Sequence, residues 1–234
     1  MVNFKDSSIT ENIKRVRDKI AEAAIKSGRQ PGDITLVAAA KTKPADYIRQ
    51  AVSAGVCAIG ENRVQEMLEK NALGAYEDAA LHFIGHLQSN KVPKVVGVCD
   101  LIESVSSKAL LEAIGKRAES RGIQQNVLIE VNIGREAQKS GIMPEQTEEI
   151  LEQASGMRGI KVLGLMSIPP IPAENERYCY YFDIMFKLFI DMRAKKYDNV
   201  SVRFLSMGMS DSYTEAIRAG SNMVRIGSAI FGER

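Results

Sequence analysis

The chain has 234 residues and a mass of 25.7 kDa, with 45% apolar and 26% charged residues, which is ordinary for a folded globular protein. This composition excludes a wholly disordered chain, a collagen-like repeat and a small domain that depends on disulfides. Lys and Arg number 31 against 29 Asp and Glu, so the net charge of +2 indicates neither a dominant nucleic-acid surface nor an anionic-membrane surface.

The first predicted element is a helix that begins near Ser8. Residues 8–11, with the sequence SITE, have the capping-box pattern. In this pattern the serine hydroxyl accepts from the backbone N–H of the glutamate three residues later, and the glutamate carboxylate accepts from the backbone N–H of the serine. An apolar stripe at helical spacing follows: Ile13, Val16, Ile20 and Ala24. We therefore expect one helix before the first strand.

Eight short segments rich in β-branched and other apolar residues come next. Most of them are nearly continuous apolar runs, which is typical of strands covered on both faces, as in a parallel sheet. The predicted strands are 35–40, 56–60, 81–85, 101–105, 127–133, 161–166, 201–205 and 223–227.

Helical patterns separate most of these strands. Residues 106–121 have an apolar stripe and stop before Gly122, a suitable residue after a helix end. Pro144 is suited to the first position of an acidic helix. A longer stripe predicts a helix face packed on the sheet: Tyr178, Phe182, Met185, Phe189 and Met192.

Eight strand–helix units in one chain of this length predict an α/β protein with a single (β/α)₈ TIM barrel and an extra N-terminal helix. A doubly wound open sheet is the alternative, since both architectures share this local pattern. No G-x-G-x-x-G follows the first strand, which disfavours a dinucleotide-binding fold. Without a linker or low-complexity tract, we expect one domain over 1–234, and a monomer because no interface stripe is evident.

Three features that the sequence lacks indicate the cellular compartment. The N-terminal region has no continuous apolar segment, so we expect no secretory signal peptide. The most apolar long segment is interrupted by charged residues, so we expect no membrane-spanning helix. The cysteines are far apart and form no Cys-x-x-Cys pair: Cys57, Cys99 and Cys179. We therefore expect reduced thiols in a cytoplasmic protein.

Functional groups of such barrels collect at the C-terminal ends of the strands. Lys41 follows the apolar run 35–40 directly, where a lysine is unusual unless its head reaches water or acts chemically. A partly buried lysine there can act as a base or form a Schiff base with a carbonyl compound. The alternative is a lysine that ends the strand and points to solvent.

The ends of the last two strands together suggest an anion site. Ser206 offers a hydroxyl, and Gly208 permits close approach of the backbone before a possible helix start at 209–211. Gly227 and Ser228 can present backbone N–H groups after the eighth strand. Phosphate sites after strands seven and eight recur in this fold. Two ordinary Gly/Ser turns are the alternative.

Other chemistries find little support. His82 and His86 are four residues apart on a strand-like segment, about 13 Å, which is too far for one metal ion. No Gly-x-Ser-x-Gly elbow and no Walker motif is present. We therefore expect no metal site.

Seven blocks of the sequence, in this order, resemble the YggS/PROSC family of pyridoxal phosphate homeostasis proteins. The resemblance runs along nearly the whole chain. The blocks are AAAKTKP at 38–44, GENRVQE at 60–66, HFIGHLQSNK at 82–91, VNI at 131–133 with QKSGI at 138–142, GLMSIP at 164–169, LSMGMS at 205–210 and VRIGSAIFG at 224–232.

This resemblance implies an alanine-racemase-like barrel that carries pyridoxal 5′-phosphate (PLP). By the same resemblance Lys41 forms the Schiff base with PLP, and Arg225 approaches the pyridine nitrogen. The phosphate is assigned to Ser206, Gly227 and Ser228, and the ring pocket to Asn62 and Met207. Lys139 is a candidate for a second PLP site.

The resemblance further implies a non-catalytic protein that buffers PLP or delivers it to apo forms of PLP-dependent enzymes. Related racemases add a second domain and use two acid–base groups, one on each face of the substrate. Lys41 serves one face, and Tyr213 and His86 are the least unsuitable choices for the other, so we expect no catalytic residues. The alternatives are a small PLP enzyme such as an amino-acid racemase, or a phosphosugar isomerase or aldolase without PLP.

Overall fold

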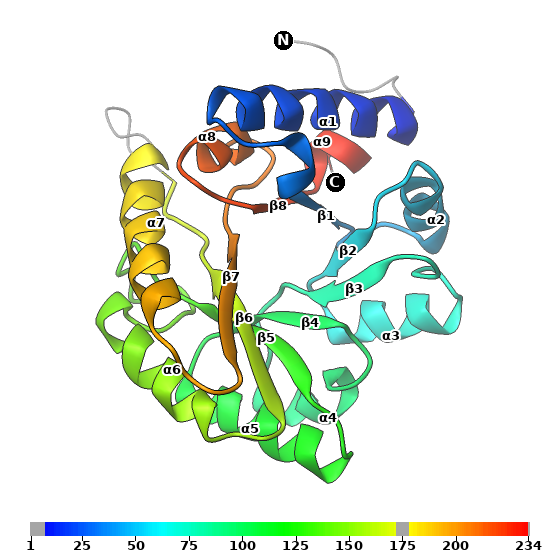
Figure 1. The fold of residues 1–234 in the computed structure, drawn as a ribbon. Coiled ribbons are helices and arrows are strands. Elements are labelled where there is room, and N and C mark those ends of the chain that lie inside the picture. The colour runs from blue at the N-terminus through cyan, green and yellow to red at the C-terminus, as the bar shows by residue number, and fades with distance from the viewer. Residues whose placement is uncertain (1–7, 172–177, 234) are drawn as a thin grey trace.

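The computed structural model describes residues 8–171 and 178–233. Their strands form one closed parallel barrel in sequence order, and β1 pairs with β8 to complete the ring (Figure 1). This closure confirms the predicted (β/α)₈ barrel over the open doubly wound sheet. The strands are β1 Thr35–Ala39, β2 Ala58–Glu61, β3 Ala80–Phe83, β4 Leu101–Val105, β5 Gln125–Glu130, β6 Ile160–Met166, β7 Val200–Ser206 and β8 Met223–Ile226.

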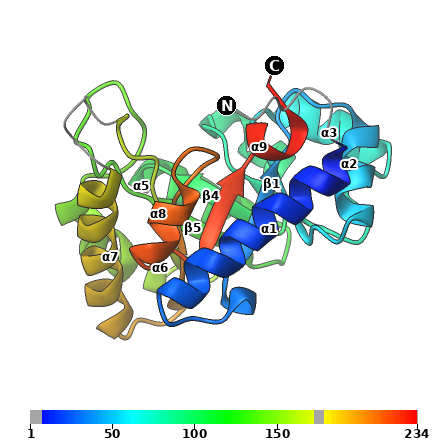
Figure 2. The same ribbon diagram turned by 90° about the horizontal axis from the view of Figure 1, so that it is seen from above.

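Every strand is followed by at least one helix, and these helices surround the barrel (Figures 1 and 2). The α-helices are α1 Ile9–Lys26, α2 Ala45–Ser53, α3 Val64–Ala72, α4 Val92–Val95, α5 Lys108–Ser120, α6 Thr147–Ser155, α7 Tyr178–Ala194, α8 Tyr213–Arg218 and α9 Ser228–Phe231. Short 3₁₀ helices are η1 Pro31–Asp33, η2 Ser89–Lys91 and η3 Pro144–Gln146. No described helix combines the length and apolar character needed to cross a membrane.

The extra helix α1 precedes the barrel, as predicted. The Ser8 hydroxyl accepts from the backbone N–H of Glu11 at 3.2 Å, and the Ser8 N–H donates to the Glu11 carboxylate at 3.0 Å, which completes the capping box. The predicted apolar stripe of α1 is buried where the helix packs against α2, α8 and α9 (Figure 2). The Asn12 side chain donates to the Ile230 carbonyl at 2.9 Å and links α1 to α9.

Three details of the predicted helices can be compared with the structure. Gly122 has a φ of +66° directly after the last turn of α5, which is the left-handed position that favours glycine. The acidic helix does not begin at Pro144, because residues 144–146 form η3 and α6 starts at Thr147. In α7 most of the predicted stripe is buried, and Tyr178 is partly exposed.

The barrel interior is built in layers. A small apolar cluster, separate from the main core, fills one layer: Val37, Ala58, Leu101, Leu128, Leu163, Met166 and Met223. The partly buried Ala80 and Phe204 pack against it. Two residues further along five of these strands stands a buried polar side chain, and period-two alternation places it on the same inner face. This polar layer consists of His82, Glu103, Glu130, Ser206 and Arg225. It lies between the apolar cluster and the C-terminal ends of the strands.

Candidate functional site

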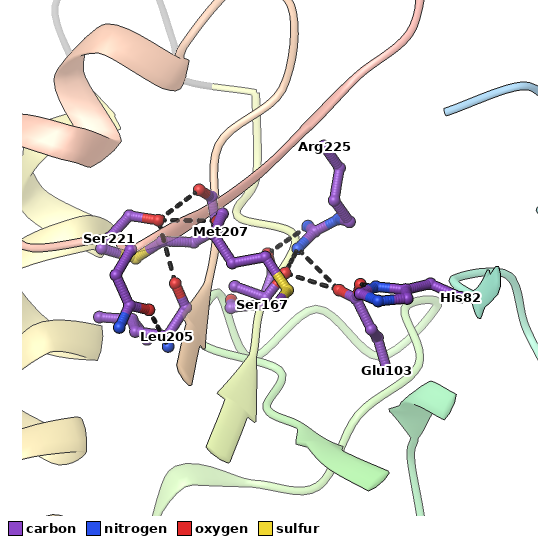
Figure 3. A network of polar contacts seen from close by, with 10 residues as sticks. His82, Glu103, Ser167, Leu205, Met207, Ser221 and Arg225 are labelled. Atoms are coloured by element: carbon purple, nitrogen blue, oxygen red, sulfur yellow. Dashed lines mark hydrogen bonds and ion pairs between the residues drawn. The ribbon is translucent and has the colours of Figure 1, made fainter. Parts of the chain in front are cut away.

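Four residues of the polar layer form one connected network, in which Figure 3 labels His82, Glu103 and Arg225. His82 Nδ1 lies 2.7 Å from Glu103 Oε1, and the Ser206 hydroxyl donates to Glu103 Oε2 at 2.6 Å. Arg225 Nη1 donates to the Ser206 oxygen at 2.5 Å, and Nη2 donates to the Ser167 carbonyl at 2.9 Å. Residues of β4 and β7, together with the residue that follows β6, therefore hold the Arg225 guanidinium inside the barrel.

In this layer, burial and the neighbouring charges shift the pKa of each ionisable group in opposite directions. Burial raises the pKa of the Glu103 carboxyl, but the hydrogen bond from His82 and the charges of His82 and Arg225 outweigh it, so the pKa lies below its ordinary value. Burial raises the pKa of Glu130, partly offset by Arg225. Burial lowers the pKa of Arg225, and both glutamates oppose that shift. An arginine so placed keeps its proton.

The lowered pKa of Glu103 predicts an acid-sensitive fold. Because its folded-state pKa lies below the unfolded value, the ionised carboxylate contributes stability above about pH 4.3 and loses it as the pH falls. We expect the free energy of unfolding to fall more steeply from about pH 6 to pH 3 in the wild-type chain than in Glu103→Gln. Urea unfolding at several pH values measures both slopes. Equal slopes, with the exposed Glu69→Gln as control, would contradict the assignment.

A cup of backbone N–H groups lies after β8. The N–H groups of Gly227 and Ala229 both donate to the Ser210 hydroxyl oxygen at 3.3 Å. A Cβ at Gly227 would lie 3.1 Å from the Ala39 carbonyl oxygen, so this backbone sits tightly against the end of β1. The Ser210 oxygen thus occupies a place where two N–H groups converge, as they would on an anion.

The loop that carries Ser210 depends on Gly208. Gly208 has a φ of +97°, and a Cβ there would lie 2.6 Å from the Ala216 side chain on α8. Its carbonyl accepts from the Arg225 N–H at 3.1 Å. Only glycine permits this close packing, which brings the loop after β7 over to β8.

Lys41 stands beside the cup at the end of β1. Its side chain is exposed, and the Lys43 N–H donates to the Ala40 carbonyl at 3.1 Å to close a turn around it. The register pairs Ala38 with Ile226 of β8 and Ala39 with Gly60 of β2. Lys41 is therefore flanked by the N–H cup on one side and by the end of β2 on the other.

Asn62 follows β2 at the same end of the barrel. Its Oδ1 atom is buried and accepts no hydrogen bond among the described residues. Gly85 permits the next loop to pack there, because a Cβ at Gly85 would lie 2.1 Å from the Asn62 carbonyl oxygen. A buried amide oxygen without a partner is uncommon, and it marks a position where a ligand donor fits.

Two predicted residues are buried. Ser206 is the last residue of β7, and its hydroxyl lies between Glu103 and Arg225 in the barrel interior, so its phosphate role stays a prediction. Met207 is fully buried in the main apolar core, so its role in a ring pocket also stays a prediction. Ser228 is exposed and follows Gly227 directly.

The remaining candidates have partners of their own. Lys139 Nζ lies 2.5 Å from Glu136 Oε2 and donates to the Pro169 carbonyl at 3.2 Å, and its second-site role stays a prediction. His86 is exposed, with Nδ1 3.1 Å from the Ser140 hydroxyl. Tyr213 is buried in the core, and burial raises the pKa of its phenol.

Sequence reasoning missed Ser210, Glu103 and Glu130. The two glutamates carried a signal, because each is a carboxylate inside an otherwise apolar strand segment, LIESV or VLIEVNI. The sequence suggests only a possible helix start for Ser210, and the resemblance assigns the phosphate to Ser206 instead. Among 8–171 and 178–233, no group of three or more His, Cys, Asp or Glu could hold a metal ion.

Known proteins are similar to this chain along nearly its whole length. The family described as alanine racemase, N-terminal domain, matches residues 6–234. A pyridoxal phosphate homeostasis protein of Aquifex aeolicus is 42% identical over 224 residues, 96% of this chain and 97% of the relative.

Two solved structures share the fold over nearly their whole length. A protein of unknown function from Bifidobacterium adolescentis is 38% identical, with a TM-score of 0.90 over 95% of this chain and 94% of that one. PipY of Synechococcus elongatus, in a structure with PLP bound, is 30% identical, with a TM-score of 0.82 over 96% of this chain and 100% of that one.

Proposed function

Because the chain belongs to the alanine racemase N-terminal domain family, with pyridoxal phosphate homeostasis proteins among its relatives, we propose that it binds PLP and holds it for homeostasis without catalytic turnover. A single observation carries the proposal. The pairing of β8 with β1 sets Gly227 against Ala39, two residues before Lys41. An anion cup and an exposed amine thus stand side by side, the cup for the phosphate of PLP and the amine for its aldehyde.

The cup fits a phosphate group. Ser210 already places one oxygen atom 3.3 Å from the N–H groups of Gly227 and Ala229. A phosphate oxygen would accept the same two N–H bonds, with the Ser210 and Ser228 hydroxyls as further donors. In this proposal Ser210 takes the role that the sequence assigned to Ser206, whose hydroxyl is committed to Glu103.

The other end of PLP fits Lys41 and Asn62. When bound, PLP supplies an aldehyde carbon that condenses with a lysine amine. Lys41 offers its amine to solvent at the mouth of the barrel. The unpartnered Oδ1 of Asn62 faces a ligand donor in this proposal, beside the ring.

Arg225 is the residue we assign to the pyridine nitrogen, as the family resemblance implies. Burial lowers the pKa of its guanidinium, Glu103 and Glu130 oppose that shift, and the arginine keeps its proton. A protonated arginine disfavours a second proton on the ring nitrogen, so the ring becomes a weaker electron sink. This environment suits storage of the cofactor better than the stabilisation of a carbanion.

Among the residues that the structure describes, we assign one acid–base group to the site, where racemisation needs two. Lys41 serves one face of a bound amino acid. Tyr213 is buried, with a pKa that burial raises, and His86 is exposed and faces Ser140. Neither is a suitable second base. The proposal therefore favours a PLP carrier over a racemase.

The carrier and the racemase differ in one experiment. We expect the PLP-loaded chain to exchange the Cα hydrogen of alanine in D₂O slowly, at least about 10²-fold below a two-base enzyme, because one acid–base group is missing. Mass spectrometry with chiral separation measures exchange and inversion together. In parallel, PLP should pass to an added apo form of a PLP-dependent enzyme and restore its activity. Fast exchange with inversion, lost in Lys41→Ala, would establish the racemase instead.

We also propose a cellular compartment, an oligomeric state and partners for the protein. Cys57, Cys99 and Cys179 are free thiols, which is ordinary in a reducing cytoplasm. We place the protein there as a monomer, with PLP and apo forms of PLP-dependent enzymes as its partners. Size-exclusion chromatography with light scattering tests the monomer.

A further inference from the structure

The two peptide groups that flank Lys41 are each held by a side chain from α3. Lys70 Nζ donates to the Ala40 carbonyl at 3.1 Å, and the Thr42 N–H donates to Glu66 Oε2 at 2.9 Å. Glu66 and Lys70 are four residues apart on one helix, so they share a face. One helix face therefore holds the backbone on both sides of the exposed amine.

Lys70 belongs to a buried charge cluster under the loop. Its Nζ lies 2.8 Å from Glu61 Oε1 and 3.8 Å from Glu66 Oε2, and the Tyr76 hydroxyl donates to Glu61 Oε1 at 3.0 Å. The Lys70 side chain is 9% exposed and that of Glu61 is fully buried. A buried ion pair is weak evidence for stability, because desolvation opposes the attraction. Its contact with the Ala40 carbonyl points to a different role.

Thr42 shows that the loop is held under constraint. Its φ is +63°, in the left-handed region that a β-branched residue rarely adopts. Such conformations persist where the surroundings over-determine them, and they cluster at ligand sites. Here the tie to Glu66 comes from the Thr42 N–H itself.

We propose that Glu66 and Lys70 are positioning residues, which fix the backbone on both sides of Lys41 so that its amine meets the ligand in one place. This inference rests on the proposed role of Lys41 in binding PLP. It also gives a role to the segment 60–66, of which the proposed function uses only Asn62. Glu61 acts in the same unit, because it holds the Lys70 ammonium against the Ala40 carbonyl.

The first test needs no PLP. Hydrogen exchange of the Thr42 amide is measured in the wild-type chain and in Glu66→Ala, Glu66→Gln and Glu69→Ala. The Gln side chain keeps an oxygen that accepts from the Thr42 N–H, whereas alanine has none. Glu69 is exposed on the same helix and serves as the control. We expect exchange to be about tenfold faster in Glu66→Ala only, since a hydrogen bond to a carboxylate is lost.

The second test measures attachment of PLP to Lys41. At saturating PLP, Glu66→Ala should slow the first-order attachment by about tenfold, while Glu66→Gln and Glu69→Ala stay within about twofold of the wild type. If attachment in Glu66→Gln is as fast as in the wild type, the slower attachment in Glu66→Ala comes from the lost hydrogen bond to the Thr42 N–H and not from the lost negative charge. Unchanged Thr42 exchange in Glu66→Ala, or unchanged attachment despite faster exchange, would overturn the proposal.

Lys70 is replaced together with its ion-pair partner Glu61, so that neither buried charge is left without the other. Lys70→Met combined with Glu61→Gln should slow attachment by about tenfold relative to the wild type, whereas Glu61→Gln alone, whose amide oxygen still accepts from the Lys70 ammonium, should slow it less. A double variant as fast as the wild type would remove Lys70 from the proposal, and if the double variant does not fold, the Glu66 series decides. Should PLP attach to another lysine in the wild type, the proposed function fails, while Thr42 exchange still reports whether Glu66 holds the loop.

Discussion

Replacing Lys41 with alanine is expected to abolish covalent attachment of PLP and the visible absorption that accompanies it. Lys41 is the exposed amine beside the N–H cup, and alanine has no group that can condense with an aldehyde. The fold should survive, because surface substitutions typically change the free energy of unfolding by no more than about 0.5 kcal/mol. Absorption spectra and thermal unfolding of the two purified chains check both parts.

Lys43→Ala is the matched control. Lys43 lies in the same turn, but its Nζ donates to the Glu233 carbonyl at 2.9 Å and so points to the C-terminal segment. This variant should keep the absorption band at the wild-type intensity. A band that survives in Lys41→Ala and disappears in Lys43→Ala would identify Lys43, and not Lys41, as the lysine that reacts with PLP.

The second large effect is expected at the cup. Gly227→Val should weaken PLP binding at least about tenfold, because a Cβ there would lie 3.1 Å from the Ala39 carbonyl oxygen and so forces the backbone N–H groups of the cup to move, and charge-assisted bonds contribute about 1.5–3 kcal/mol each. Titration followed by fluorescence measures the affinity. Gly32→Val is the control, since a Cβ at Gly32 meets no atom within 4 Å.

Two serine variants locate the phosphate within the same titration. Ser210→Ala should weaken PLP binding, because Ser210 stands against the N–H groups of the cup. Ser206→Ala should mainly lower the free energy of unfolding, because it removes the hydroxyl between Glu103 and Arg225. The reverse pattern would return the phosphate to Ser206, as the sequence first suggested.

The barrel could be predicted because each strand is a short, nearly continuous apolar run followed by a helical pattern. The limits of β5 could not, because the strand begins at Gln125 rather than Val127. Polar residues enter that strand since their side chains find partners: Gln125 accepts from the Gly97 N–H at 2.9 Å and donates to the Cys99 carbonyl at 3.1 Å. Such partners come from distant loops, which composition does not reveal.

The site was predictable where it depends on strand ends, and not where it depends on partners from distant strands. Lys41 and Gly227 stand beside one another because β1 pairs with β8, which closure of a barrel requires. The sequence could not show that the Ser206 hydroxyl has Glu103 and Arg225 as partners, because those residues come from other strands. The ties from Glu66 and Lys70 involve residues more than twenty positions away, and only the folded chain brings them together.

Peptide mapping of the wild-type chain, loaded with PLP and reduced with borohydride, tests the central claim most directly. Reduction fixes PLP on whichever lysine has condensed with it, and mass spectrometry identifies that lysine. The account predicts the modification on Lys41, at close to one per chain. A modification mainly on another lysine, such as Lys43 or Lys139, or no modification at all, would contradict it.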